Sequence, residues 1–159
     1  ANDCPRTCVP SAVEDGDTIL IERAMAGRHK LLIGGDISQD AIDHTRTNFG
    51  NRHKPWDLRR WDASQIPLED RAIDKVVSNL PWARQYGSRV DLGKLHSRFL
   101  SEVTRVQRIG ARGVFLVGAW SEFRKALSRT NELRQVKHLK DVFVLGRRAD
   151  ILILEKASG

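Results

Sequence analysis

Three polar residues stand at the ends of stretches whose patterns indicate strands, and their types are those that bind a nucleoside. They are Asp36, Asp62 and Asn79. A carboxylate at such a position can accept both hydrogen bonds of a ribose diol, and a second one can accept from the amine of an adenine. A single aspartate after a strand is more often a turn former or a helix cap. We therefore base the interpretation on the three positions together.

The third position opens the segment "SNLPW", which could act on a planar amine. The side-chain carbonyl of Asn79 and the backbone carbonyl of Leu80 can both accept hydrogen bonds from such an amine. Pro81 fixes one dihedral and Trp82 offers a flat face on which a base can stack. Two carbonyls would direct the lone pair of the amine along a third direction, where a positioned electrophilic methyl group could react. In isolation the same letters also fit a proline turn beside the core.

Strand and helix patterns alternate along the chain, which predicts the elements that position these residues. Short apolar or alternating runs predict strands, whereas apolar steps of three and four and capping residues predict helices. We expect strands over 29–36, 56–62, 71–79 and 112–120, helices over 38–51, 91–106 and 121–133, and a final hairpin of 141–146 and 149–155 joined by "RR". This order predicts an α/β fold, with a mostly parallel sheet and a C-terminal antiparallel hairpin. Ligands of such sheets bind beyond the carboxyl ends of the strands.

The composition limits the class of protein. A chain of 159 residues suits one domain, and no apolar run approaches the length of a membrane span. The amino-terminal residues lack the order of a signal peptide, so we predict a cytoplasmic protein. A net charge of +7 suits a nucleic-acid partner, although a basic surface alone is equally consistent with an unrelated function. Cys4 and Cys8 have no second cysteine pair, and no metal site is predicted.

With these motifs in place, the sequence resembles class I S-adenosylmethionine-dependent methyltransferases. It is most similar to the tRNA guanine-N2 methyltransferases that carry a THUMP domain. The similarity runs from residue 18 to 155, and its most specific part is "NLPW" followed by a Gly-Ser pair. It implies a Rossmann-like fold, S-adenosyl-L-methionine as cofactor, RNA and most closely tRNA as partner, and a THUMP-like RNA-binding domain in the full-length protein.

The resemblance also assigns roles to residues of this sequence. It implies cofactor binding through Thr18, Asp36, Ile37, Asp62, Ala63 and Asn79. It implies catalysis, and binding of the target base, through Asn79, Leu80, Pro81 and Trp82. Four arginines are candidate phosphate contacts: Arg46, Arg52, Arg84 and Arg89.

One segment departs from the family pattern. "SAVEDGDT" stands where a glycine-rich cofactor loop is expected, and glycines are used there because the backbone approaches the ligand closely. The prolines upstream argue against a central strand. We therefore divide the chain into an atypical segment, 1–17, and a methyltransferase catalytic domain, 18–159, and expect that the first strand could be missing.

Three other functions stay open at this point. One is methylation of adenine N6 in DNA or ribosomal RNA by the same chemistry. Another is a non-catalytic RNA-binding module that lost its cofactor loop. A nicotinamide-binding domain is weaker, because the G-x-G-x-x-G fingerprint is absent.

Overall fold

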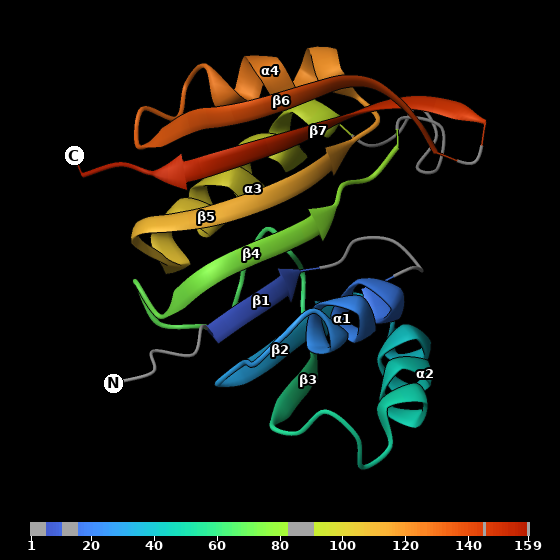
Figure 1. Cartoon of the computed structure of the whole chain (residues 1–159). Helices are drawn as coiled ribbons and strands as arrows, with labels where there is room; N and C mark the ends of the chain where they lie inside the picture. Colours follow the sequence, from blue (N-terminus) through green and yellow to red (C-terminus); the bar gives the residue numbers. More distant parts are fainter. Residues whose placement is uncertain (1–5, 11–15, 83–90, 145, 159) are drawn as a thin grey trace.

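The fold is built on one twisted sheet of seven strands (Figure 1). The computed structural model describes residues 6–10, 16–82, 91–144 and 146–158. The strands lie in the order β3-β2-β1-β4-β5-β7-β6. The strands are β1 (Arg6–Pro10), β2 (Leu31–Asp36), β3 (Trp56–Arg60), β4 (Ile73–Asn79), β5 (Gln107–Val117), β6 (Leu133–Val144) and β7 (Arg147–Lys156). The first five strands are parallel and the last two pair antiparallel, as the sequence predicts.

The prediction that the first strand could be missing is wrong. Arg6–Pro10 forms β1, which lies at the centre of the sheet between β2 and β4 and is parallel to both. Pro10 is the last residue of this strand, opposite Gly35. A proline there interrupts the ladder only where the strand ends, so it is compatible with a central position.

Helices cover the two faces of the sheet in separate pairs. Helices α1 (Gly16–Met25) and α2 (Gln39–Phe49) lie in front of the β1–β3 part in Figure 1, and α3 (Leu92–Val106) and α4 (Trp120–Leu127) lie behind the other part. Each pair closes its own core. Phe49 and Leu32 belong to the first core, whereas Phe99 and Phe115 belong to the second.

The caps predicted for two helices are confirmed. The Ser38 hydroxyl accepts a hydrogen bond from the backbone N–H of Ala41, and Gly50 ends α2 with a φ of 53°. Asp91 caps α3 by accepting from the N–H of Lys94. Such caps satisfy backbone groups that a helix end leaves without partners. Among the described residues, no helix is both long and apolar enough to cross a bilayer.

The carboxyl-terminal half differs from the prediction in its boundaries. Strand β5 begins five residues earlier than expected, and α4 ends at Leu127, six residues before the predicted end. Strand β6 begins at Leu133 instead of residue 141, and the "RR" pair lies inside β7 instead of in the turn. Most of β6 is exposed and polar because it is the edge strand, so its sequence lacks the apolar alternation of a buried strand.

Candidate active site

The carboxyl ends of β2 and β4 bring two of the predicted residues to the same level of the sheet. Pro10 ends β1 opposite Gly35, so Asp36 lies one residue beyond that end. Cys8 is opposite Val76, and continuing this register places Asn79 one residue beyond the end as well. The two backbones are separated by β1 alone, about 10 Å or two strand spacings. An elongated ligand lying across the end of β1 can therefore contact both.

Asp36 is buried and held in a defined position. The residue is only 6% exposed, and its Oδ1 accepts a hydrogen bond of 2.7 Å from the backbone N–H of Ser38. The next residue, Ile37, is exposed, and its carbonyl accepts a hydrogen bond of 3.0 Å from Arg60 Nε. The chain therefore turns outward at the carboxyl end of β2, and these hydrogen bonds hold its backbone in place.

Trp61 fits against the strand that carries Asp36. Its backbone N–H donates a hydrogen bond to the Asp36 carbonyl at 2.9 Å. A Cβ at Gly35 would overlap the indole ring of Trp61, so only glycine allows the ring to pack this closely on β2. Trp61 is itself 6% exposed and belongs to the larger core, which makes the end of β2 rigid.

The loop after β3 presents the second predicted carboxylate. Asp62 is exposed, and its Oδ1 accepts from the N–H of Ser64 at 2.8 Å. Ala63 beside it is buried against the core. Because β3 lies next to β2, Asp62 faces solvent at the same edge of the sheet as Asp36. Its carboxylate can reach a ligand, whereas Ala63 anchors the loop.

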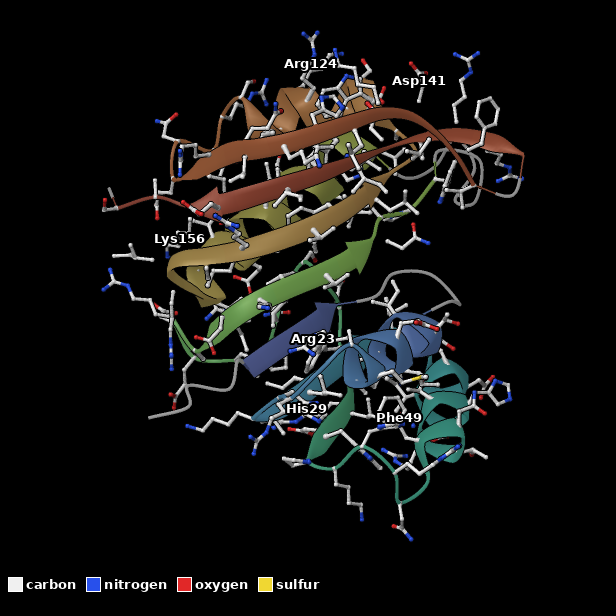
Figure 2. The ribbon with its side chains drawn as sticks, viewed as in Figure 1. Arg23, His29, Phe49, Arg124, Asp141 and Lys156 are labelled. Carbon is white, nitrogen blue, oxygen red and sulfur yellow. The ribbon has the colours of Figure 1, made fainter. Side chains whose placement is uncertain are left out.

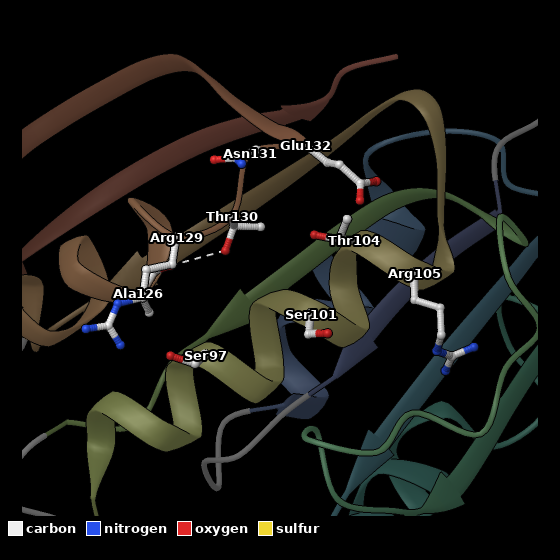
Figure 3. Close-up of a pocket in the computed structure, with 9 residues that line it drawn as sticks. All are labelled: Ser97, Ser101, Thr104, Arg105, Ala126, Arg129, Thr130, Asn131 and Glu132. Atoms are coloured by element: carbon white, nitrogen blue, oxygen red, sulfur yellow. Dashed lines mark hydrogen bonds between the residues drawn. The ribbon is translucent and has the colours of Figure 1, made fainter. Parts of the chain in front are cut away.

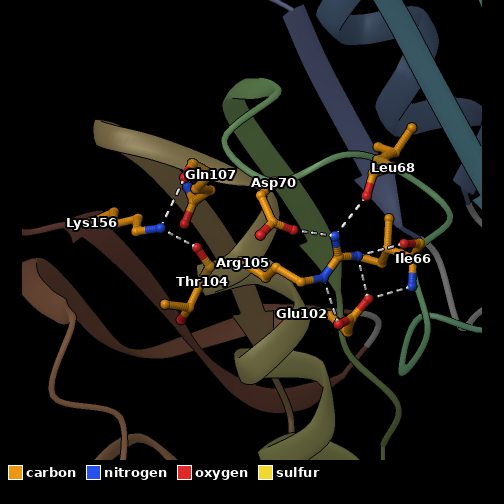
Figure 4. A network of polar contacts seen from close by, with 8 residues as sticks. All are labelled: Ile66, Leu68, Asp70, Glu102, Thr104, Arg105, Gln107 and Lys156. Carbon is orange, nitrogen blue, oxygen red and sulfur yellow. Dashed lines mark hydrogen bonds and ion pairs between the residues drawn. The ribbon is translucent and has the colours of Figure 1, made fainter.

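An ionic network fixes the same loop to α3 (Figure 4). The guanidinium of Arg105 donates to the carbonyl oxygens of Ile66 and Leu68, at 2.7 and 2.6 Å, and to Oδ1 of Asp70 at 2.9 Å. Glu102 accepts from Arg105 and from the N–H of Ile66. Hydrogen bonds from Arg105 hold the pKa of Glu102 below its usual value, and the two carboxylates raise the pKa of Arg105. Charge-assisted bonds of this kind are the stronger class of hydrogen bond.

The "NLPW" motif follows β4 and combines a buried polar atom with an aromatic face. Asn79 Oδ1 is buried and has no hydrogen-bond partner among the described residues. Leu80 is 2% exposed, and its N–H donates to the carbonyl of Leu116 at 2.9 Å, so the motif stays attached to β5. Pro81 is buried. A buried amide oxygen without a partner is costly, which is typical of a site whose partner arrives with a ligand.

Trp82 lies against the end of β5. Its indole is half-buried, and a Cβ at Gly118 would overlap the ring. The ring therefore rests directly on the backbone that follows Val117. This close approach fixes the plane on which a base could stack, three residues after Asn79 in the sequence.

The remaining sequence-predicted residues that the structure describes do not lie at the strand ends themselves. Thr18 is exposed in the first turn of α1, whose amino terminus follows β1. Arg52 donates to the carbonyl of Asn48 at the end of α2 that leads into β3, which is the opposite edge of the sheet. Arg46, on the same helix, pairs with Asp43. Residues 11–15, Arg84 and Arg89 lie outside the described residues.

A hollow of about 770 Å³ has none of Asp36, Asp62 and Asn79 in its lining (Figure 3). It is formed by α3 and by the segment that leads from α4 into β6. Its lining includes Ser101, Thr104 and Asn131, close to where β5 begins. Ligands of parallel sheets bind at the carboxyl ends of the strands. We therefore assign the site to the strand ends that carry Asp36 and Asn79.

The sequence did not reveal three of the residues that shape this edge. Gly35 and Gly118 admit the two indole rings, and Arg105 holds the Asp62 loop from another element. A glycine at a strand end is a visible signal for a close approach, but its partner is not. The arrangement as a whole can hold a nucleoside between two carboxylates and present an amine to Asn79.

Comparison with known proteins indicates the family of this chain. A family model described as an RMKL-like methyltransferase domain matches residues 16–149. The tRNA (guanine(6)-N(2))-methyltransferase THUMP3 of Mus musculus is 27% identical over 145 residues, which are 91% of this chain and 27% of that protein. The U6 snRNA (guanine-N(2))-methyltransferase THUMPD2 of Bos taurus is 31% identical over 103 residues, 63% of this chain and 20% of that protein. The match thus spans between a fifth and about a quarter of the length of these curated relatives.

Solved structures share the fold. A SAM-dependent methyltransferase of Methanosarcina mazei superposes with a TM-score of 0.76 at 16% identity, covering 100% of this chain and 95% of the other. TrmN of Thermus thermophilus also has a TM-score of 0.76, at 18% identity over 96% of this chain and 44% of the other. The predicted fold is confirmed, as is the methyltransferase class with S-adenosyl-L-methionine as the cofactor of that class. The chain belongs to the family of RMKL-like methyltransferase domains.

Proposed function

We propose that this chain is the catalytic domain of an RNA methyltransferase that methylates the exocyclic N2 amine of a guanine in a tRNA. The observation that supports it best is the Asn79 oxygen, buried without a partner among the described residues at the end of β4. Asn79 is three residues before Trp82 and lies level with Asp36 across β1. The names of the curated relatives point to guanine N2, in a tRNA for one and in U6 snRNA for the other.

The residues fit the cofactor that the class requires. The fixed carboxylate of Asp36 would hold the ribose, with Ile37 beside it, and the exposed carboxylate of Asp62 would accept from the adenine amine next to Ala63. Thr18, in the first turn of α1, would lie near the methionine end. When bound, the cofactor supplies an electrophilic methyl group on a sulfonium.

The residues of the motif would act on the target base. Asn79 Oδ1 and the Leu80 carbonyl would accept the two N2 protons of guanine and so aim its lone pair, while Trp82 holds the ring by stacking. Pro81 keeps the turn stiff. The base has to be flipped out of its stack, which costs a few kcal/mol that stacking and pocket contacts offset. Positioning of this kind supplies much of the rate of a transfer that needs no metal.

The experiment uses the full-length protein that contains this chain. Isothermal titration with S-adenosylhomocysteine tests the cofactor site, and methyl transfer to unmodified tRNA, followed by nucleoside mass spectrometry, identifies the product. We expect binding and N2-methylguanosine. N6-methyladenosine would replace the proposal by the adenine reading, and absence of binding would favour a non-catalytic RNA module.

Three wider statements belong to the same proposal. The full-length protein carries a THUMP-like RNA-binding domain and acts in the cytoplasm. The division of the chain at residue 17 also remains a prediction, since β1 lies in the sheet while 11–15 are not described. Limited proteolysis of the full-length protein would locate the domain boundary.

A further inference from the structure

A second hollow lies beside Gly118, in the part of the sheet on the other side of β4 from Asp36. Its volume is about 350 Å³, and it lies between the end of β5, the start of α4 and the β6–β7 hairpin. Gly118 lines it and also carries the Trp82 ring, so the two sites share a wall. The lining consists of Val117, Gly118, Trp120, Lys140, Asp141, Arg148, Ala149 and Asp150.

The hairpin projects beyond the strand ends at the edge where the site lies. Asp150 pairs with Val117, the last residue of β5, so the part of β7 before Asp150 extends past that strand. Figure 1 shows the β6–β7 tip reaching beyond the arrowhead of β5. In Figure 2, Asp141 lies toward this end of the strand pair and Lys156 at the other. The hairpin is therefore the element next to β5 that projects beyond the strand ends.

A β-bulge turns two residues of β6 out of the ladder at this point. Leu139 pairs with Ile151 and Val142 with Ala149, so Lys140 and Asp141 together oppose Asp150 alone. Asp141 adopts a φ of 55°. Bulges occur next to active sites, where they redirect side chains.

Buried groups hold the bulge in place. Asp150 Oδ1 accepts from the N–H of Asp141 at 3.0 Å, and Oδ2 bonds His138 Nε2 at 2.8 Å. The side chains of His138 and Asp150 are 10% and 14% exposed. The His138 ring lies on Trp120, with 4.5 Å between centroids. These contacts therefore fix the backbone on which Lys140 is carried.

The tip carries an exposed aromatic ring beside a cation. Phe143 is 69% exposed and pairs in register with Arg148, whose guanidinium carbon lies 5.5 Å from the ring centroid. Arg148 also lines the hollow, and its partner Asp141 is 3.2 Å away. Both members of that ion pair are more than half exposed, so the pair contributes little and a phosphate can compete for Arg148.

The charge of the tip is positive. Residues 140–148 read "KDVFVLGRR", with three basic side chains and one acidic. A positive tip with an exposed ring suits an occupant that has both a phosphate and a flat base.

We propose that the hairpin tip binds the nucleotide next to the flipped target base in a single-stranded stretch of RNA. Its base stacks on Phe143, and its phosphate accepts hydrogen bonds from Lys140 and Arg148. This inference rests on the proposed function, because it assumes that the target base occupies the Trp82 face. When one base is extruded, its neighbour stays attached through one phosphate and reaches the hollow that shares the Gly118 wall.

The test measures binding of a short fluorescein-labelled single-stranded RNA to the full-length protein by fluorescence anisotropy. Loss of one stacked base weakens binding at least about fivefold, so Phe143→Ala should raise the Kd by that factor and Phe143→Trp should restore it. Ile109→Ala is the matched control, since Ile109 is 54% exposed near the start of β5. Phe143 is exposed, so its removal should leave the melting temperature unchanged.

A salt titration tests the phosphate contact separately. Lys140→Ala and Arg148→Ala should each lower the slope of log Kd against log salt concentration by about 1, whereas Lys30→Ala, an exposed lysine at the opposite edge, should not. With 4-thiouridine beside the target guanosine, the photo-cross-link should map to residues 140–148.

The outcomes separate the two proposals. Unchanged RNA affinity of Phe143→Ala, or a cross-link mapped elsewhere, overturns the hairpin proposal even if the protein methylates guanine. A wild-type protein that binds no RNA also overturns it. A fivefold loss with Phe143→Ala in a protein that binds no S-adenosylhomocysteine keeps the hairpin contact and overturns the proposed methyl transfer.

Discussion

The two halves of the sheet differ in how they position polar groups. In the half formed by β3, β2, β1 and β4, parallel strands end together, and the polar residues lie at these ends on buried backbone. In the half formed by β5, β7 and β6, the strands are longer, and the antiparallel pair β6–β7 carries exposed side chains past the end of β5. Short parallel strands can hold a small cofactor rigidly, whereas a protruding hairpin can follow a larger and more variable substrate.

The largest effect is expected where the two halves meet. Asn79→Ala removes the oxygen proposed to aim the amine, and loss of one such preorganised dipole costs about 10²- to 10³-fold in rate. Single-turnover methyl transfer to RNA measures this. Folding should be unaffected, because Asn79 Oδ1 has no partner among the described residues. Asn131→Ala, in the hollow shown in Figure 3, is the control, and an equal loss there would contradict the assignment.

A smaller effect should be confined to the parallel half. Asp36→Ala removes a charged acceptor of ribose hydrogen bonds, worth about 1.5–3 kcal/mol, so the Kd of S-adenosylhomocysteine should rise about 10- to 100-fold. Asp62→Ala should have less effect, because Asp62 is exposed to solvent and Asp36 is buried. Isothermal titration compares the two. A larger effect at Asp62 would reverse their proposed ranks.

The base-facing side can be disturbed without touching the cofactor. Gly118→Ala places a methyl group where the Trp82 ring lies and should tilt the stacking face. We expect the KM for RNA to rise about tenfold, since a stacked base contributes about 1–3 kcal/mol. Affinity for S-adenosylhomocysteine should not change. A rise in both constants would mean that the two halves are coupled through this glycine.

Arg105 lies on α3 and holds the loop that follows β3. Arg105→Ala removes hydrogen bonds to two loop carbonyls and to Glu102 and Asp70. Because the Arg105 side chain is one-third exposed, we expect a loss of about 1 kcal/mol in the free energy of unfolding. Urea denaturation measures it, with Arg134→Ala on the exposed face of β6 as the control. Equal losses would show that the network adds nothing to ordinary surface pairing.

The smallest effect concerns the core under the hairpin half. His96 is fully buried against Phe123, and burial lowers the pKa of its ring below the usual value. Below about pH 6.5 the unfolded chain binds a proton that the folded chain does not, so stability falls as the pH falls. The loss between pH 7 and pH 6 is at most about 0.7 kcal/mol. His96→Leu should abolish it, whereas His44→Leu, on the surface of α2, should not.

Apart from β1, which the sequence did not predict, the parallel half was predictable because its strands are short and end at recognisable residues. The caps Ser38 and Asp91 lie where the sequence places them, and Asp36 and Asn79 end their strands as expected. The edge strand β6 was predicted only for its last four residues, because burial on one side of an exposed strand leaves little alternation to detect.

The sequence by itself determined the order of most strands and helices after β1, the residues at the strand ends and the family to which their pattern points. These follow from local periodicity and from short motifs, which need no long-range contact. Only the tertiary structure decided that Arg6–Pro10 is the central strand, that Gly118 supports Trp82, that Arg105 ties down the loop of Asp62, and that a bulged hairpin stands beside the site. Each of these depends on residues far apart in the chain, and their pairing is set by packing and register rather than by any local pattern.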